Sequence, residues 1–169
     1  PFKGCLYFGL MLTPDGPKVI EYNCRFGDPE TQVVLPLLES DLLTVMQACT
    51  NGTLDKTEVK FNDGAAACVV LASGGYPVAY EKGKEITGLE NGQVPGAADV
   101  TVYHAGTAIK DGKLVTNGGR VLGVTATAAT LPEALKKAYA AADCIHFDKL
   151  HRRSDIGARA LAAMKAQEG

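Results

Sequence analysis

The sequence lacks the features that would place it on nucleic acid, in a membrane or in a disulfide-linked scaffold. Its formal net charge is only -2, so broad attraction to nucleic acid or to an anionic membrane is not expected. The longest apolar run, residues 65–72, is far shorter than the roughly 20 residues that cross a bilayer. The 5 cysteines are scattered and form no Cys-x-x-Cys pair, which argues against a zinc site or a disulfide framework. We therefore expect a reduced, cytoplasmic protein with no nucleic-acid or membrane partner.

The first residues also lack an initiator methionine and a signal segment, and they read PFKGCLYF. This start predicts a chain that begins in the middle of a longer protein. With 169 residues, of which 46% are hydrophobic and 21% charged, the composition is that of an ordinary globular protein. Its length leaves room for one core or two small ones.

A β-hairpin is predicted at the amino terminus. Residues 4–13 and 18–23 are both rich in β-favouring side chains, and the turn signal Pro-Asp-Gly-Pro at residues 14–17 separates them. This pattern joins two antiparallel strands by a tight turn.

Two helices are predicted after the hairpin. Asp28 suits the cap and Pro29 the first position of a helix start, and we expect residues 31–38 to form a short helix. A second helix is expected to begin near Asp41 and to end at the Asn-Gly pair of residues 51–52.

The sequence turns polar and non-periodic after the second helix, and we place a domain boundary near Asn62. Beyond it, residues 65–71 and 120–127 predict buried strands, residues 131–142 predict a helix, and Ser154 suits the cap of a last helix. The expected fold class is α+β, with domains over residues 1–62 and 63–169.

A possible metal site lies on the second strand of the hairpin. Side chains alternate along a strand, so Glu21 and Asn23 project to one face while Ile20 and Tyr22 project to the other. A carboxylate and an amide carbonyl suit Mg²⁺, which prefers oxygen ligands and completes its shell with phosphate and water. Arg25, two residues further in the same alternation, could hold a phosphoryl group on this face.

Spacing alone leaves a second interpretation open. Glu-x-Asn-x-Arg on a strand is more often the solvated face of an amphipathic hairpin than a metal site. Here the strand continues directly into GDPETQ at residues 27–32, a polar loop that delivers the start of a helix beside the two oxygen donors. This context favours the site.

Four segments in order carry a family resemblance. They are LYFGLM (residues 6–11), EYNCRFGDPETQ (residues 21–32), HAGT (residues 104–107) and NGGRVL (residues 117–122). Together they resemble the carboxy-terminal portion of glycinamide ribonucleotide synthetase (phosphoribosylamine–glycine ligase), an ATP-grasp enzyme family of purine biosynthesis. The resemblance implies the carboxy-terminal part of an ATP-grasp domain, made of a β-hairpin and helices, followed by a small mixed α/β domain.

The resemblance also implies site roles. It makes Glu21 and Asn23 ligands of Mg²⁺ (or Mn²⁺) on the phosphates of ATP, and it makes Arg25 the catalytic residue beside the γ-phosphate. It implies that five further residues bind substrates, with glycine or the nucleotide near the first three and the ribose phosphate near the last two: Asp28, Glu30, Thr31, Lys113 and Arg120.

The reaction implied by the resemblance joins glycine to phosphoribosylamine with ATP as co-substrate, through glycyl phosphate. The family's amino-terminal and ATP-covering parts precede the segment seen here, so we expect that missing portion to be a partner and the isolated chain to be inactive. Two alternatives stay open. One is another ATP-grasp carboxylate–amine ligase of nucleotide synthesis, and the other is a non-catalytic carboxy-terminal module.

Overall fold

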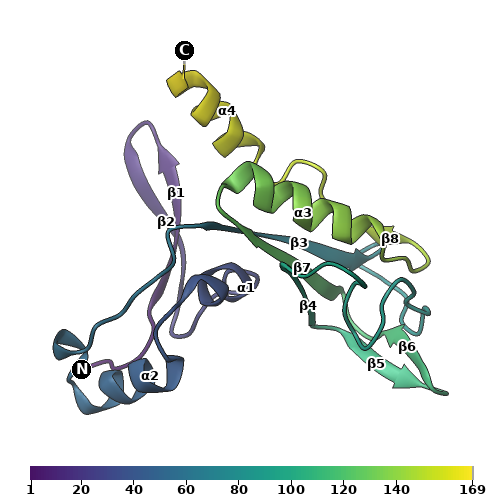
Figure 1. The fold of residues 1–169 in the computed structure, drawn as a ribbon, viewed down its shortest axis with the longest axis horizontal. Helices are drawn as coiled ribbons and strands as arrows, with labels where there is room; N and C mark the ends of the chain where they lie inside the picture. Colours follow the sequence, from purple (N-terminus) through teal and green to yellow (C-terminus); the bar gives the residue numbers. More distant parts are fainter. Residues whose placement is uncertain (169) are drawn as a thin grey trace. The chain divides into compact units, whose positions relative to one another are not determined.

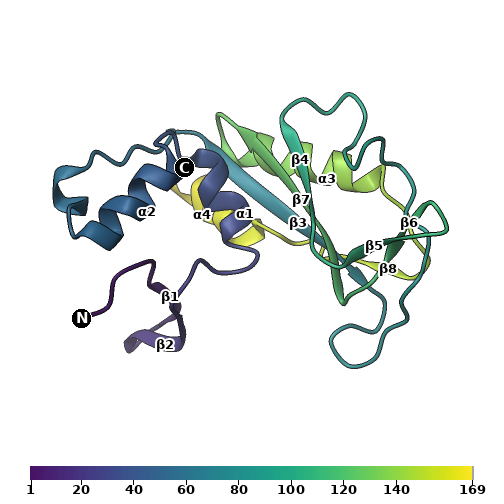
Figure 2. The same ribbon diagram turned by 90° about the horizontal axis from the view of Figure 1, so that it is seen from below.

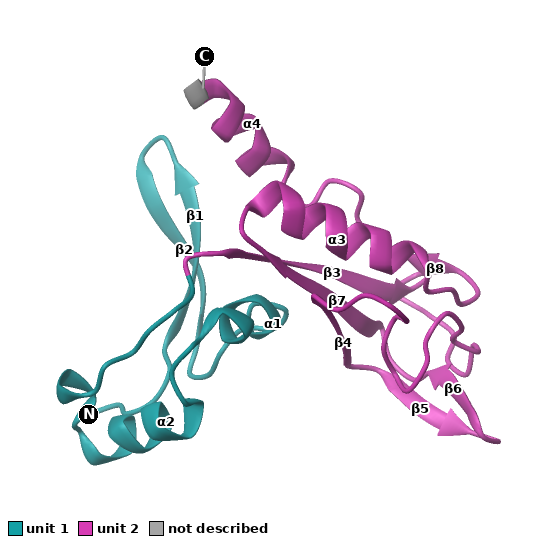
Figure 3. Cartoon of the chain, in the orientation of Figure 1, with its two compact units in different colours: residues 1–62 teal, residues 63–169 magenta. Residues whose placement is uncertain are grey.

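The computed structural model describes residues 1–168 and divides the chain into two compact units (Figure 3). The first unit is Pro1–Asn62, and the second begins at Asp63. Within the described residues, no helix has both the length and the apolar character needed to cross a membrane.

The first unit opens with an antiparallel hairpin of β1 (Tyr7–Thr13) and β2 (Gly16–Asn23) (Figure 1). The Thr13 hydroxyl donates to the carbonyl of Gly16 at 2.7 Å across the tight turn. Gly16 has φ +94°, a left-handed conformation that a side chain disfavours. The predicted hairpin and its turn are therefore confirmed.

Short helices follow the hairpin. They are α1 (Thr31–Val34), the 3₁₀ turn η1 (Leu35–Leu37), α2 (Leu42–Asn51) and the 3₁₀ turn η2 (Leu54–Lys56). As expected, α2 begins after Asp41, whose carboxylate accepts from the backbone N–H of Thr44 at 2.7 Å. It ends at Gly52, which has φ +71° and caps the helix in the left-handed region.

As expected, α1 begins at Thr31, but its predicted cap was wrong by two residues. The cap position belongs to Glu30 and not to Asp28, so Pro29 precedes the helix instead of opening it. The reason is a turn that closes first: both the N–H and the hydroxyl of Thr31 donate to the carbonyl of Gly27.

The second unit is built on a four-stranded antiparallel sheet in the order β4-β7-β3-β8. Its members are β3 (Ala65–Ser73), β4 (Val100–His104), β7 (Arg120–Ala128) and the short β8 (Leu150–His151). The apolar run that predicted a buried strand is β3, which lies between two other strands. Its neighbour β7 also lies inside the sheet and is buried continuously over residues 121–126, whereas β3 is buried continuously only over residues 71–73.

One face of this sheet is covered by α3 (Leu131–Asp143), which lies along β3 and β7 (Figure 1). Directly paired residues share a face, and Val69 with Val124 and Leu71 with Leu122 form two such pairs. These four side chains are at most 1% exposed and pack in one core with the apolar stripe of α3, including Ala138.

A second hairpin lies beyond the end of the sheet where β4 stops and β7 begins (Figures 1 and 2). It pairs β5 (Thr107–Lys110) with β6 (Lys113–Thr116). The turn residues Asp111 and Gly112 have φ +51° and +76°, the double left-handed geometry that Asp-Gly pairs favour in tight hairpin turns.

The last helix, α4 (Ala158–Glu168), begins four residues after its predicted cap, Ser154. Gly157 has φ +80°, so a helix cannot run through it from Ser154. The preceding segment is instead tied to α3 by the Tyr139 hydroxyl, which donates to the Arg153 carbonyl at 3.0 Å and accepts from the Ile156 N–H at 3.1 Å.

Candidate functional site

The candidate site in the first unit lies on one face of the β1–β2 hairpin. The register places Gly9 opposite Glu21 and Tyr7 opposite Asn23. Because directly opposed residues of an antiparallel pair project to the same face, all four share one face at the end of the hairpin away from its turn. The alternation predicted for Glu21 and Asn23 is present.

The two candidate ligand side chains on this face are adjacent. The Asn23 amide nitrogen donates to Glu21 Oε1 at 3.1 Å. A half-turn of the amide exchanges its nitrogen and oxygen and places two oxygens at about that separation. Two neighbouring ligands of an octahedral Mg²⁺ with bonds of 2.0–2.1 Å lie about 2.9 Å apart. The pair therefore fits the chelating edge of a magnesium ion.

No third metal-binding side chain completes a protein cage: over residues 1–168, no three His, Cys, Asp or Glu side chains cluster in a metal-binding arrangement. Two oxygen ligands from the protein are the usual number where Mg²⁺ is held between a protein and substrate phosphates. The Glu21 and Asn23 pair therefore suits an ion shared with substrate phosphates better than a structural ion held by protein ligands alone.

Gly9 makes room for the Glu21 side chain. A Cβ atom at position 9 would lie 2.9 Å from Glu21 Cγ, closer than real Cβ contacts allow. The glycine on β1 is thus part of the site because it lets the opposing carboxylate lie over the hairpin.

A second carboxylate is brought to the same face from the loop that follows β2. The Tyr7 hydroxyl donates to Glu30 Oε1 at 3.0 Å. This hydrogen bond raises the pKa of Tyr7, and burial together with the charges of Glu30 and Glu21 raises it further. A side chain at Gly27 would collide with the Glu30 carboxylate, so Gly27 is needed for Glu30 to reach this position.

Arg25 lies beyond the end of β2, so its expected place on the Glu21 and Asn23 face stays a prediction. Because β2 ends at Asn23, the strand period does not extend to Arg25. Its Nη1 donates to the carbonyl of Phe26 at 2.9 Å. The residue lines a cavity of about 450 Å³ together with residues from the amino terminus and from α2, among them Met46.

Asp28 and Thr31 have structural partners within the loop. Asp28 Oδ1 accepts from the Gln32 amide at 2.8 Å, and the Thr31 hydroxyl donates to the Gly27 carbonyl. Among the predicted substrate-binding residues of this unit, Glu30 is brought to the Glu21 and Asn23 face by its hydrogen bond from Tyr7.

The two predicted phosphate-binding residues of the second unit lie on different strands. Arg120 opens β7, pairs with Ala72 across the sheet and is partly buried. Lys113 lies next to the β5–β6 turn, and its ammonium pairs with Glu85 at 2.7 Å. Arg120 is the first residue of β7, whereas the Lys113 ammonium already forms an ion pair with Glu85 at the surface.

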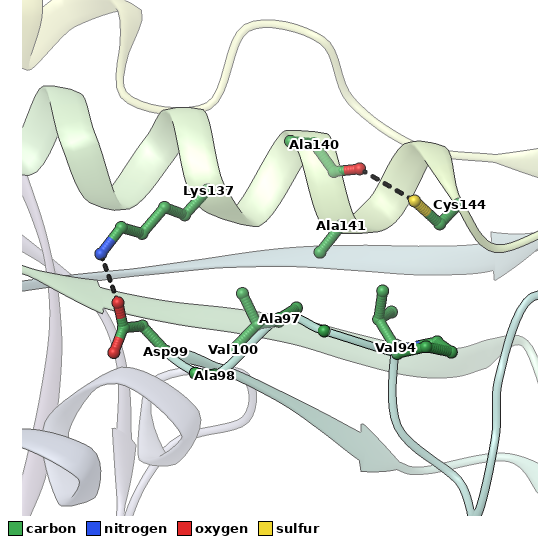
Figure 4. Close-up of a pocket in the computed structure, with 11 residues that line it drawn as sticks. Val94, Ala97, Ala98, Asp99, Val100, Lys137, Ala140, Ala141 and Cys144 are labelled. Carbon is green, nitrogen blue, oxygen red and sulfur yellow. Dashed lines mark hydrogen bonds and ion pairs between the residues drawn. The ribbon is translucent and has the colours of Figure 1, made fainter.

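A cavity of about 440 Å³ lies between the loop at residues 94–100 and α3, and none of the predicted site residues lines it (Figure 4). At one end the Lys137 ammonium pairs with Asp99 at 2.6 Å, and at the other the Cys144 thiol faces the Ala140 carbonyl at 3.5 Å. The lining between them consists of small apolar residues. This apolar part of the lining offers no group suited to bind phosphate or metal.

Comparison with known proteins gives two family matches in chain order. The model of the phosphoribosylglycinamide synthetase ATP-grasp (A) domain matches residues 1–31, and that of the phosphoribosylglycinamide synthetase C domain matches residues 66–159. The second match alone covers more than half of the chain. The chain belongs to the phosphoribosylglycinamide synthetase family. The resemblance drawn from the four sequence segments is confirmed.

Relatives within the family are similar over nearly the whole chain. The trifunctional purine biosynthetic protein adenosine-3 of Gallus gallus is 54% identical over 170 residues, covering 100% of this chain and 17% of the relative. The phosphoribosylamine–glycine ligase of Synechocystis is 52% identical over 162 residues, covering 95% of this chain and 38% of the relative. The chain thus spans well under half the length of these relatives.

Solved structures agree with the assignment. The crystal structure of phosphoribosylamine–glycine ligase from Thermotoga maritima matches with a TM-score of 0.74 and 44% identity over 89% of this chain and 36% of that one. The biotin carboxylase subunit of pyruvate carboxylase matches with a TM-score of 0.57 at 18% identity over 92% of this chain and 36% of that one, a likeness of fold alone. The predicted α+β class of the synthetase fold is confirmed.

Three contributors to the synthetase hairpin site were missed by sequence reasoning. They are Tyr7, Gly9 and Gly27, and each acts by holding or admitting a carboxylate. Gly9 could not have been found from the turn at residues 14–17, because the register shifts between Gly9 and Leu10 and only that shift brings Gly9 opposite Glu21. The Tyr7–Glu30 contact depends on the path of the loop after β2, which no periodicity predicts.

Proposed function

We propose that this chain is part of an ATP-dependent phosphoribosylamine–glycine ligase of purine biosynthesis, acting in the cytoplasm. The observation that carries the proposal is the Glu21–Asn23 pair in a chain of the phosphoribosylglycinamide synthetase family, with the Asn23 amide nitrogen 3.1 Å from Glu21 Oε1. The names of the relatives support glycine and phosphoribosylamine as substrates, and the match to the ATP-grasp (A) domain supports ATP.

In this proposal Glu21 and Asn23 hold Mg²⁺, or Mn²⁺ in its place, against the phosphates of ATP. The ion would neutralise charge on the phosphoryl group as it is transferred. Glu30, fixed by Tyr7, supplies a second carboxylate on the same face and is the best-placed residue to bind a cationic group such as the ammonium of glycine.

Arg25 is proposed to steady the transferred phosphoryl group. Its guanidinium donates to the uncharged carbonyl of Phe26, and a phosphate oxyanion would accept a stronger, charge-assisted hydrogen bond. Asp28 and Thr31 shape the loop that carries Glu30, so we assign them a supporting part in substrate binding. The chemistry needs positioning and charge neutralisation, and no enzyme nucleophile.

The proposed reaction has two steps. A carboxylate oxygen of glycine attacks the γ-phosphorus of ATP, the bond to the β–γ bridging oxygen breaks, and ADP leaves with glycyl phosphate formed. The amine of phosphoribosylamine then attacks the acyl carbon, phosphate leaves, and one proton is released as the amide of glycinamide ribonucleotide forms. Arg120, with Lys113 as the weaker candidate, is proposed to hold the ribose 5-phosphate.

The rest of such an enzyme would supply the ATP-covering surface. Apolar side chains of the hairpin stand uncovered, including Leu12 at 83%, Ile20 at 63% and Tyr22 at 59% exposure. Exposed apolar patches of this kind commonly mark an interaction surface. We therefore propose that further parts of the enzyme pack on the hairpin and that the isolated chain is inactive.

The test is substrate dependence in the complete enzyme that contains this chain. ADP should form at a steady rate only when glycine and phosphoribosylamine are both present, and glycinamide ribonucleotide should accumulate in equal amount. Steady ADP release without phosphoribosylamine, or with a different amine acceptor preferred, would contradict the assignment. Calorimetry on the isolated chain should show no tight Mg-ATP binding, and micromolar affinity would contradict its proposed incompleteness.

A further inference from the structure

The segment that leads into Arg120 packs against an aromatic ring. A Cβ atom at Gly119 would lie 2.0 Å from Tyr76 Cδ2 and 2.5 Å from Cε2. These separations are far inside contact distance, so the ring edge lies directly on the Gly119 backbone and only glycine leaves it space. Tyr76 comes from the loop after β3, more than forty residues earlier in the chain.

The same segment is held from two other sides. Ser73, at the end of β3 and only 4% exposed, donates its N–H to the Gly119 carbonyl and its hydroxyl to the Gly118 carbonyl, both at 2.8 Å. Gly106 lies against Gly118 so closely that a Cβ on either would be within 3.0 Å of the other's Cα. The backbone before Arg120 is therefore fixed on every side described.

Tyr76 is itself anchored. Its N–H donates to the Ser73 carbonyl at 3.1 Å, and its ring meets the ring of Tyr80 edge-on with centroids 5.9 Å apart. The side chain is 41% exposed, and its hydroxyl makes no hydrogen bond within the described chain. The contact with Gly119 is thus made by the ring and does not involve the hydroxyl.

We propose that Tyr76 is a positioning residue for Arg120: its ring fixes the Gly118–Gly119 backbone and thereby sets the direction in which Arg120 enters the sheet. The proposal rests on the proposed role of Arg120 in holding the phosphate of phosphoribosylamine. Removing the ring would take away one of the contacts that hold the Gly119 backbone, and misplacement of a binding group by about 1 Å can cost as much as 100-fold.

The experiment compares four forms of the complete enzyme: wild type, Tyr76→Leu, Arg120→Ala and the double variant. Tyr76→Leu should raise the KM for phosphoribosylamine by about tenfold or more, with little change in the KM for ATP or glycine. In the Arg120→Ala background the same substitution should have no further effect, because the residue it positions is gone. Additive effects, or equal changes in all three KM values, would overturn the proposal.

Two further variants keep the test decisive if Tyr76→Leu folds poorly. Tyr76→Phe keeps the ring and should leave the KM for phosphoribosylamine unchanged; a rise would mean that the hydroxyl contacts substrate and would overturn the positioning role. Gly119→Ala should displace the ring and raise the KM for phosphoribosylamine. In a Tyr76→Ala background, Gly119→Ala should raise this KM little further, because no ring is left for the new Cβ to clash with. An unaffected KM in Gly119→Ala would also count against the proposal.

Failure of the inference can be told apart from failure of the proposed function. If the wild-type enzyme does not require phosphoribosylamine, the function is wrong whatever the variants do. If it does, and Arg120→Ala raises the KM for phosphoribosylamine while Tyr76→Leu and Gly119→Ala do not, only the positioning role is wrong.

Discussion

Gly9 and Glu21 face each other across the β1–β2 hairpin, and the absence of a side chain on Gly9 gives the Glu21 carboxylate its place. The carboxylate in turn accepts from the amide of Asn23, the next residue on that face of β2. A small residue on one strand thus shapes a ligand pair on the other, which links the sequence of β1 to the proposed chemistry of β2.

Gly9→Ala is expected to weaken metal binding in the complete enzyme. The new Cβ would lie 2.9 Å from Glu21 Cγ, so the carboxylate must shift. We expect the Mg²⁺ concentration for half-maximal activity to rise about tenfold, as when the outer support of a metal ligand is removed. The control is Gly9→Ala in a Glu21→Gln background, where it should add nothing. An unchanged Mg²⁺ curve for the single variant would show that Gly9 does not position Glu21.

Tyr7→Phe should change how the stability of the chain depends on alkaline pH. The hydrogen bond to Glu30, burial, and the charges of Glu30 and Glu21 raise the Tyr7 pKa in the folded chain. A raised pKa stabilises the fold fully below the unfolded value of about 10, and that stabilisation is lost as pH rises through the folded value. Urea unfolding should therefore give a constant difference between wild type and Tyr7→Phe from about pH 7 to 9, and a shrinking one above about pH 10. A difference that stays flat to about pH 11 would contradict the Tyr7–Glu30 contact.

Leu122→Ala should strongly destabilise the second unit. Leu122 is 1% exposed and packs beside Leu71 beneath α3, so its truncation leaves a cavity in the core. The expected loss in the free energy of unfolding is about 2–5 kcal/mol. The matched control is Ile109→Ala on the β5–β6 hairpin, where the side chain is 71% exposed and the expected change is within about 0.5 kcal/mol. Equal losses in urea unfolding would mean that the core is misassigned.

Much of the fold follows from short-range rules. The Pro-Asp-Gly-Pro and Asp-Gly turns give both hairpins, and the cap at Asp41 with the left-handed Gly52 gives both ends of α2. Strand alternation alone places Glu21 and Asn23 on one face, because both lie inside β2.

The errors and the open predictions lie where the chain leaves a regular element. Alternation could not place Arg25, since β2 ends two residues earlier. Ser154 resembles a helix cap, but Gly157 adopts a left-handed conformation and Tyr139 on α3 holds the segment before it. The path of the segment after Ser154 depends on contacts with a distant residue, which a local pattern cannot contain.

The hairpin pair also shows why composition and spacing could not settle the function alone. Glu-x-Asn on a strand can equally form the solvated face of an amphipathic hairpin. The structure adds the 3.1 Å hydrogen bond from the Asn23 amide nitrogen to Glu21 Oε1 and the Tyr7–Glu30 contact beside it. A solvated face has no need of a second carboxylate fixed next to the first.

The most direct test of the central claim is steady-state ADP formation by the complete enzyme carrying Glu21→Ala together with Asn23→Ala, at saturating ATP, glycine, phosphoribosylamine and Mg²⁺. Circular dichroism and the urea midpoint should match the wild type, because both side chains lie on the hairpin surface outside the core. We expect kcat to fall by at least about 100-fold, while Asn23→Asp, which keeps an oxygen donor, retains most of it. Normal turnover in the folded double variant would contradict the assignment of these two residues as the metal ligands.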